Sequence, residues 1–416
     1  MKNKLILVLC LLLIATIVLA GCASPSGDLM KGIISKNKDR VPESMDIELN
    51  QAILNFTWNL FKESSENPGN IMISAPSAYF ALAMTLNGAA NETKNEMLKA
   101  LSADNISLED LNTGLNDWMI LISKNRTAKF SITNSIWLRE GFNANKDFLQ
   151  TNADYYSAYI RSLDFGDASA PDEINKWVKE ATNDTIDKIV DEISDDLMMY
   201  LINAIYFKGD WKEQFSANKT REMEFNTPSG KVETDFMNRR GNIDYLKLKD
   251  ITGVILPYVD EQFAFVGLLP AEDQTPKELI NELSALDLMR LLSNKEVKNI
   301  ELSLPKFESS YEDSLKNELS SLGMEMAFEP YNADFSLMRE DLKKDLFISN
   351  VKQKTYIKVD EKGTEASAVT SVEVETTSMP PELPKIVFDR PFVYGIIDVE
   401  TGIPLFIGIM ENPSIK

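Results

Sequence analysis

The sequence predicts an α+β fold in one large domain, and three observations support this prediction. Helical and strand-like patterns occur in separate blocks, without a regular alternation of single strands and helices. Hydrophobic residues make up 44% of the 416 residues and charged residues 26%, which is typical of a globular chain with a large core. No repeat or low-complexity block interrupts the pattern.

Apolar spacing gives the order of the elements. In the first helix, Leu49, Ile53, Phe56 and Leu60 recur at helical spacing. The predicted helices are 46–63, 76–100, 172–190, 276–294 and 311–322. An apolar strand is predicted at 196–208, short alternating strands at 220–268, a strand at 302–306, and further strands from 346 onward.

The charged and catalytic residue types exclude several functions. The formal net charge is −21, so nucleic acid is not an expected partner, because phosphate contacts need clustered cations. The chain contains no histidine, which removes His-dependent nucleophilic catalysis and the commonest metal ligand. No P-loop, GxGxxG or HExxH motif is present. An enzyme that uses a Ser-Lys pair or carboxylates remains possible. We expect no enzyme activity, no cofactor and no metal site.

Residues 1–21 have the features of a signal peptide. Lys2 and Lys4 give a positive start, an apolar stretch covers 5–19, and small residues precede Cys22. This ending resembles a lipoprotein signal, in which Cys22 receives the lipid. An uncleaved membrane helix is the alternative, but about 15 apolar residues are short for about 30 Å of hydrocarbon. We expect an extracytoplasmic protein, lipid-anchored to the outer face of the cell membrane or secreted.

Residues 22–44 are polar and predict a tether, so that the folded domain covers 45–416. Removal of the signal peptide would remove Cys10, and lipidation would use Cys22. The mature chain would then have no disulfide, which a large core makes unnecessary.

The segment 361–384 is unusual because it is long and lies between apolar strands. It contains neither Gly nor Pro over 364–379, and its residues alternate with a period of two. One face holds only small or β-branched uncharged residues: Thr364, Ala366, Ala368, Thr370, Val372 and Val374. The other face holds the charges: Glu365, Ser367, Val369, Ser371, Glu373 and Glu375. The pattern fits an ordinary strand with one solvated face, or a loop that can become a strand without burying a charge.

A family resemblance distinguishes these two interpretations. Six separated stretches resemble motifs of the serpins, in the family's order: NIMISAPSAYFALAMTLNGAANET (70–93), NAIYFKGDWKEQF (203–215), LPKF (304–307), EKGTEASA (361–368), VFDRPFVYGII (387–397) and PLFIGIMENP (404–413). The resemblance runs from about residue 46 to the end of the chain. It implies about nine helices, three β-sheets and an exposed reactive-centre loop over about 361–384.

The resemblance also implies a function. A serpin inhibits serine-type endopeptidases as a suicide substrate: the protease cleaves the reactive loop, and the loop inserts into the main sheet. The implied hinge comprises Glu361, Gly363, Thr364, Glu365, Ala366, Ser367 and Ala368. Gly363 is expected to provide backbone freedom. The inward positions carry neither a charge nor proline, which favours an inhibitory member.

The family's usual spacing from Glu361 places the scissile bond between Thr377 and Ser378. A small β-branched residue before the bond favours an elastase-like or subtilisin-like target over a trypsin-like one. A shift of one or two residues would instead place Glu375 or Met379 before the bond, and would change the class of target.

The resemblance assigns control of sheet opening to a further set of residues: Trp211, Lys306 paired with Glu361, and a central cluster of Ser74, Ser77, Asn203 and Gln353. Gln353 stands where the family usually has histidine, so the cluster is expected to lack pH sensitivity. For Ser74 and Ser77, helix capping is the simpler interpretation. For Trp211, the simpler interpretation is packing in the core.

Two other functions remain open at this stage. A non-inhibitory binding or structural lipoprotein could share the fold, and a lipoprotein enzyme or solute-binding protein is the third hypothesis. The small-residue hinge favours the inhibitor, which is expected to act as a monomer.

Overall fold

The computed structural model describes residues 27–415, apart from 38, 125–126, 195–196 and 365–382. Its helices are α2 (Ile47–Ser64), α3 (Ala75–Leu86), α4 (Asn91–Ala100), α5 (Leu108–Ser123), α6 (Lys146–Tyr156), α7 (Ala170–Ala181), α8 (Pro276–Glu282), α9 (Ala285–Ser293) and α10 (Lys316–Ser321). The described part therefore has the expected nine α-helices in an α+β arrangement.

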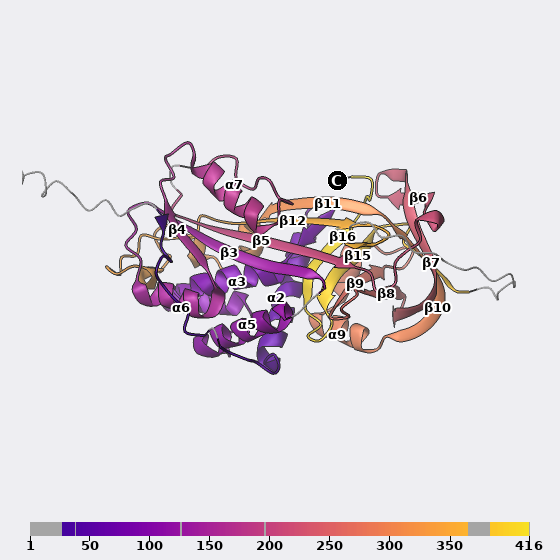
Figure 1. Ribbon diagram of the computed structural model, residues 1–416, viewed down its shortest axis with the longest axis horizontal. Coiled ribbons are helices and arrows are strands. Elements are labelled where there is room, and N and C mark those ends of the chain that lie inside the picture. Colours follow the sequence, from indigo (N-terminus) through magenta and orange to yellow (C-terminus); the bar gives the residue numbers. More distant parts are fainter. Residues whose placement is uncertain (1–26, 38, 125–126, 195–196, 365–382, 416) are drawn as a thin grey trace, which may run out of the picture.

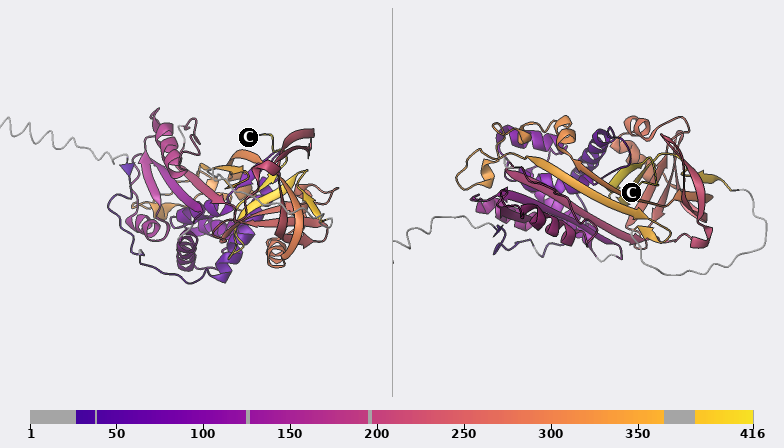
Figure 2. Two further views of the ribbon diagram at one scale, coloured as in Figure 1. Left: turned by 45° about the vertical axis from the view of Figure 1, so that its right-hand side comes forward. Right: turned by 90° about the horizontal axis from the view of Figure 1, so that it is seen from above.

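Seven strands form the central sheet, in the order β1-β4-β3-β5-β13-β12-β11. Their bounds are β1 (Gly27–Asp28), β3 (Lys129–Arg139), β4 (Tyr159–Leu163), β5 (Met199–Asp210), β11 (Phe307–Ser314), β12 (Asn350–Val359) and β13 (Gly363–Thr364). Seen from above, the orange β12 and the magenta β5 run side by side (Figure 2, right).

The other strands form a nine-stranded network in the order β14-β10-β7-β8-β9-β15-β16-β2, with β6 paired to β7. Their bounds are β2 (Ile71–Ile73), β6 (Arg221–Thr227), β7 (Gly230–Leu248), β8 (Ile251–Pro257), β9 (Phe263–Leu269), β10 (Glu296–Pro305), β14 (Lys385–Val387), β15 (Phe392–Asp398) and β16 (Pro404–Met410). The resemblance implies three sheets. Here the long β7 pairs with β6 and β10 along one part and with β8 along another, which joins the two smaller sheets into one hydrogen-bonded network.

Helices cover both faces of the central sheet. Figure 1 shows α2, α3, α5 and α6 below it and α7 above it. Every residue of α3 is buried, because this helix lies between the sheet and α2. The Asp46 carboxylate caps α2 by accepting the Leu49 N–H at 2.9 Å, a contact that typically stabilises a helix by about 1 kcal/mol.

Four of the predicted helical ranges need correction. The range 76–100 is two helices: α3 ends at Leu86, α4 begins at Asn91, and Gly88 lies between them where a Cβ atom would overlap the Met338 side chain. The range 172–190 ends at Ala181, since Asn183 and Asp184 adopt positive φ angles.

The range 276–294 is also divided, because Ser284 caps a new helix, α9, in a capping box with Asp287. The start of 311–322 is wrong, because residues up to Ser314 belong to β11, which pairs with β12 along its whole length.

The predicted tether is wrong for the part of 22–44 that the structure describes. Gly27 and Asp28 add a strand, β1, to the edge of the central sheet beside β4. Leu29, Met30 and Ile33 then pack against the main core. The polar composition of this segment reflects its position on the surface and does not make it free of the domain.

Within the described residues, no helix is both long and apolar enough to cross a membrane. The described part also contains no group of three His, Cys, Asp or Glu side chains arranged to hold a metal ion.

Candidate functional site at the parted strands of the central sheet

The candidate site lies where β5 and β12 separate. These parallel strands pair directly from Tyr200 to Ala204 on β5 and from Asn350 to Lys354 on β12. Further along, β13 lies between them: Thr364 is in register with Gly209 on one side and with Val359 on the other. The chain that leaves Thr364 is therefore already positioned at the mouth of a gap between two strands.

Gly363 allows this close approach of β13 to β5. A Cβ atom there would overlap the Gly209 carbonyl oxygen and lie 2.7 Å from the Asp210 Cα. The φ angle of Gly363 is not positive, so the expected backbone freedom is not the reason for glycine at this position. Instead, glycine is needed because two backbones approach each other too closely for a side chain.

Thr364 is the first hinge side chain inside the sheet, and it is 2% exposed. Its Oγ1 shares a hydrogen bond of 2.6 Å with the Tyr258 hydroxyl. Burial raises the pKa of Tyr258, so the phenol stays neutral and able to donate. A small hydroxyl side chain fits this position, whereas a charge would lose its hydration with no counter-charge among these contacts.

Trp211 holds the turn that precedes β13. Its backbone N–H donates to the Lys362 carbonyl oxygen, and its indole Nε1–H donates to the Asp360 carbonyl oxygen, both at 2.8 Å. Its ring stacks on Tyr258 with centroids 4.8 Å apart and an interplanar angle of 12°. Trp211 therefore packs in the core and also fixes the position of the hinge.

Glu361 connects the hinge to the second sheet. Its carboxylate accepts from Lys306 Nζ at 3.1 Å and from Thr220 Oγ1 at 2.7 Å, and its carbonyl accepts the Phe215 N–H at 2.8 Å. Burial alone would raise the pKa of Glu361. The hydrogen bonds from Thr220, from its own backbone and from Lys306 outweigh burial and lower it.

The central cluster forms where the two strands still pair. Gln353 binds Ser74 twice: its Oε1 accepts the Ser74 N–H, and its Nε2 donates to the Ser74 carbonyl oxygen, both at 2.8 Å. The Ser74 side chain caps α3 by accepting the Ser77 N–H at 3.4 Å, as expected for helix capping. The Ser77 hydroxyl lies 3.5 Å from Asn134 Oδ1.

Asn203 is directly in register with Gln353 and is fully buried. Neither its Oδ1 nor its Nδ2 has a hydrogen-bond partner among the described residues. A buried polar group without a partner costs about 1–3 kcal/mol, so this row of the sheet is destabilised where the two strands meet.

Several predicted site residues lie outside the described part: Glu365, Ala366, Ser367, Ala368, Thr377, Ser378 and Cys22. The other predicted residues form two groups, the hinge with Trp211 and Lys306, and the cluster around Gln353. Sequence reasoning missed Tyr258, Thr220 and Asn134, because their partners are more than 50 residues away along the chain.

These features define a protein whose central sheet has two parallel strands that part and hold a short third strand between them. A family model described as Serpin (serine protease inhibitor) matches residues 51–413. The chain belongs to this family.

Two relatives illustrate the range of the family. An uncharacterized serpin-like protein of Thermococcus kodakarensis is 32% identical over 385 residues, which cover 90% of this chain and 88% of that protein. A leukocyte elastase inhibitor of Xenopus laevis is 31% identical over 380 residues, which cover 88% of this chain and 99% of that protein.

Solved structures agree, and they include two states of one protein. The native state of tengpin, a thermophilic serpin, matches with a TM-score of 0.87 and 38% identity, over 93% of this chain and 100% of that chain. The latent state of tengpin matches with a TM-score of 0.78 and 39% identity, over 89% of this chain and 99% of that chain. The described residues therefore resemble the native state more closely.

Replacing Gly363 by alanine is expected to expel β13 from the sheet, because the new methyl group would meet fixed backbone atoms. We expect a cost of about 1–3 kcal/mol and a change in Trp211 fluorescence. Hydrogen exchange at 359–364 measures the loss of pairing. Gly166→Ala is the matched control, since its new Cβ would meet only an exposed carboxylate at 3.3 Å. Unchanged exchange in Gly363→Ala would contradict the packing argument.

The ion pair of Glu361 is expected to make the hinge sensitive to acid. Because folding lowers the pKa of Glu361, its stabilisation is present at neutral pH and is lost as the pH falls below the ordinary carboxyl range. Glu361→Gln should cost about 0–1 kcal/mol at pH 7 and nothing at low pH. The test is the difference in unfolding free energy between the two proteins at each pH. If the difference in unfolding free energy grew on acidification, folding would not lower the pKa of Glu361.

Proposed function

We propose that this protein inhibits serine-type endopeptidases by suicide-substrate trapping. The protease serine oxygen adds to the Thr377 carbonyl carbon, the Thr377–Ser378 bond breaks, and the Ser378 amine leaves with a proton from the protease. The new ester joins Thr377 to the protease. The loop then continues the path that β13 has begun, and carries the protease with it.

The observation that carries this proposal is the register of β13 between β5 and β12. If the pairing of Thr364 with Gly209 and Val359 continues, residue 370 arrives opposite both Asn203 and Gln353. Residues directly opposite in a sheet point to the same face. The small residues Thr364, Ala366, Ala368 and Thr370 would then all face the core, and the Thr370 hydroxyl would supply the partner that the Asn203 amide lacks.

Charged residues on the solvent-facing side of the proposed insertion path also support the proposal. In this register, Glu365 falls between Lys208 of β5 and Lys358 of β12. The first charged side chain of the loop would thus lie between two lysines, and the nearest carboxylate of the row, Glu308 of β11, lies on the far side of Lys358. Each new ladder hydrogen bond adds about 0.5–1.5 kcal/mol, so a path of about ten residues favours the inserted form.

The proposed target class follows from Thr377. Its small side chain suits elastase-like or subtilisin-like proteases, and a relative named as a leukocyte elastase inhibitor is consistent with this choice. A bond shifted to Glu375 or Met379 would select other proteases. We also propose that the protein acts as a monomer, outside the cytoplasm, with a lipid on Cys22.

Exposure of the purified protein to pancreatic elastase and subtilisin is expected to give a covalent complex that survives denaturing electrophoresis. Thr364→Arg should abolish the complex and leave a cleaved substrate, because a charge would enter the buried position beside Tyr258. Ser367→Arg is the matched control, since its side chain would point to the outer face. Equal trapping by both variants would contradict insertion. Cleavage of the loop without a rise in melting temperature would favour a non-inhibitory member of the family.

Thr370→Val tests the register directly. Valine has nearly the same shape but no hydroxyl, so the inserted form would keep Asn203 without a partner. We expect cleaved Thr370→Val to be about 1–3 kcal/mol less stable than cleaved wild type, while the uncleaved proteins match. Thr376→Val is the control, because residue 376 would extend beyond the end of β5. An equal effect of both variants would show that the register is different.

A further inference from the structure

The N-terminal segment Gly27–Asp46, called the strap, lies at one end of the insertion path. Gly27 is in register with Ser162 of β4, Ser162 with Leu138 of β3, and Leu138 with Met199 of β5. Thr364 is in register with Gly209 at the other end of β5. At about 3.3 Å per residue, the two ends of this path are about 33 Å apart.

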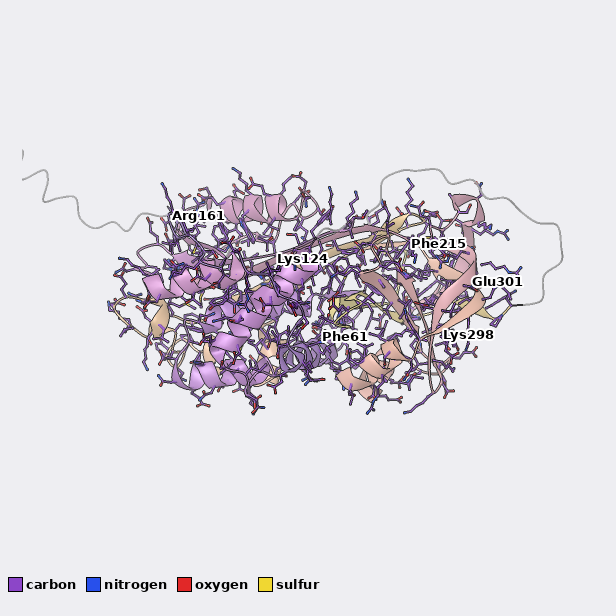
Figure 3. The ribbon with its side chains drawn as sticks, turned by 60° about the horizontal axis from the view of Figure 1, so that its bottom comes forward. Phe61, Lys124, Arg161, Phe215, Lys298 and Glu301 are labelled. Carbon is purple, nitrogen blue, oxygen red and sulfur yellow. The ribbon has the colours of Figure 1, made fainter. Side chains whose placement is uncertain are left out.

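Figure 3 shows these two ends on labelled residues. Arg161, which is the register partner of Asp28, lies at one end of the long axis. Phe215, whose N–H donates to Glu361, lies toward the other end. The strap therefore docks at the end of the molecule remote from the hinge.

Insertion would bring the trapped protease to the strap. In the register of β13, residue 374 reaches the row of Met199, and the attached Thr377 follows just beyond that row. The slot is four strand spacings from β1, which is about 19 Å at about 4.8 Å each. A compact protease of about 250 residues has a radius of gyration of about 18 Å and an outer radius of about 23 Å. A body of this width, held at this end of the slot, would extend laterally over the end of the sheet at which β1 docks.

The hydrogen bonds of the strap mostly lie at the surface. Gly27 N–H donates to Ser162 Oγ at 3.1 Å, Leu29 N–H to the Ile160 carbonyl oxygen at 2.9 Å, and Lys36 N–H to Asp154 Oδ1 at 2.7 Å. Arg40 pairs with Asp117. Ile34 and Val41 remain 68% and 78% exposed. Leu29, Met30 and Ile33 are only partly buried against the core, so docking buries only part of the strap's apolar surface.

We propose that the arriving protease displaces the strap, which becomes an extended tether in the trapped complex. This inference rests on the proposed function. Before trapping, Cys22 lies five residues from the docked Gly27, a span of at most about 18 Å. After release, the chain from Cys22 to Asp46 spans up to about 80 Å. A lipid-anchored inhibitor needs that length, because the protease would otherwise be forced between the domain and the bilayer.

Hydrogen exchange on the full chain tests the proposal in three forms: uncleaved, loop-cleaved without retained protease, and covalently complexed with subtilisin or elastase. The amides of Leu29 and Lys36 are expected to exchange at least tenfold faster in the complex alone. The amides of β16, which pairs with β2 and β15 away from the strap, serve as the control and stay protected.

Each other outcome overturns the inference in a distinct way. A complex whose Leu29 and Lys36 stay protected would show that the strap remains docked, and would leave the proposed function intact. Equal deprotection in the cleaved form would assign release to widening of the sheet and not to the protease. Absence of any covalent complex would overturn the proposed function together with the inference.

Discussion

The structure depends on an incomplete ladder between two parallel strands. β5 and β12 pair as far as Ala204 and Lys354, and among the described residues their further pairing is to β13 and to their outer neighbours. The backbone groups that could pair with one more strand are the feature on which the proposed insertion of the loop depends. The other features of the site would decide whether the loop inserts there, and in which register.

Two sets of contacts hold the strands in their present arrangement, and they differ in chemistry. At the mouth of the gap, Trp211 and Glu361 fix the hinge through backbone carbonyls and an ion pair. In the middle, Gln353 fastens β12 to the start of α3, and Thr355 Oγ1 donates to the Met72 carbonyl oxygen at 2.7 Å. Under the proposed function, insertion would separate the second set, while the first would keep the start of the loop at the mouth of the gap.

The sequence predicts elements whose periodicity is strong and local. The helix α2 and the strand β5 are found within two or three residues of the predicted ranges, because their apolar spacing directly reflects burial. The helices α5 and α6 and the strands β3 and β4 were not predicted. Residues 311–314 alternate weakly, and only their pairing with β12 makes them a strand.

Recognition of the site from the sequence was similarly uneven. Motif spacing brought Trp211, Lys306, Glu361 and Gln353 together, and the structure places them at two ends of one gap. The unpartnered amide of Asn203 and the backbone contact that requires glycine at 363 depend on three-dimensional register. No local sequence pattern predicts either feature. The docking of the polar strap could not be predicted either, because it also depends on contacts between distant parts of the chain.

The double hydrogen bond of Gln353 to Ser74 has a consequence for how the central sheet responds to pH. An amide neither gains nor loses a proton between mildly acidic and mildly alkaline surroundings, so this fastening keeps the same strength throughout that range. The attachment of β12 to the start of α3 is therefore insensitive to acidification, unlike the ion pair of Glu361 at the other end of the gap.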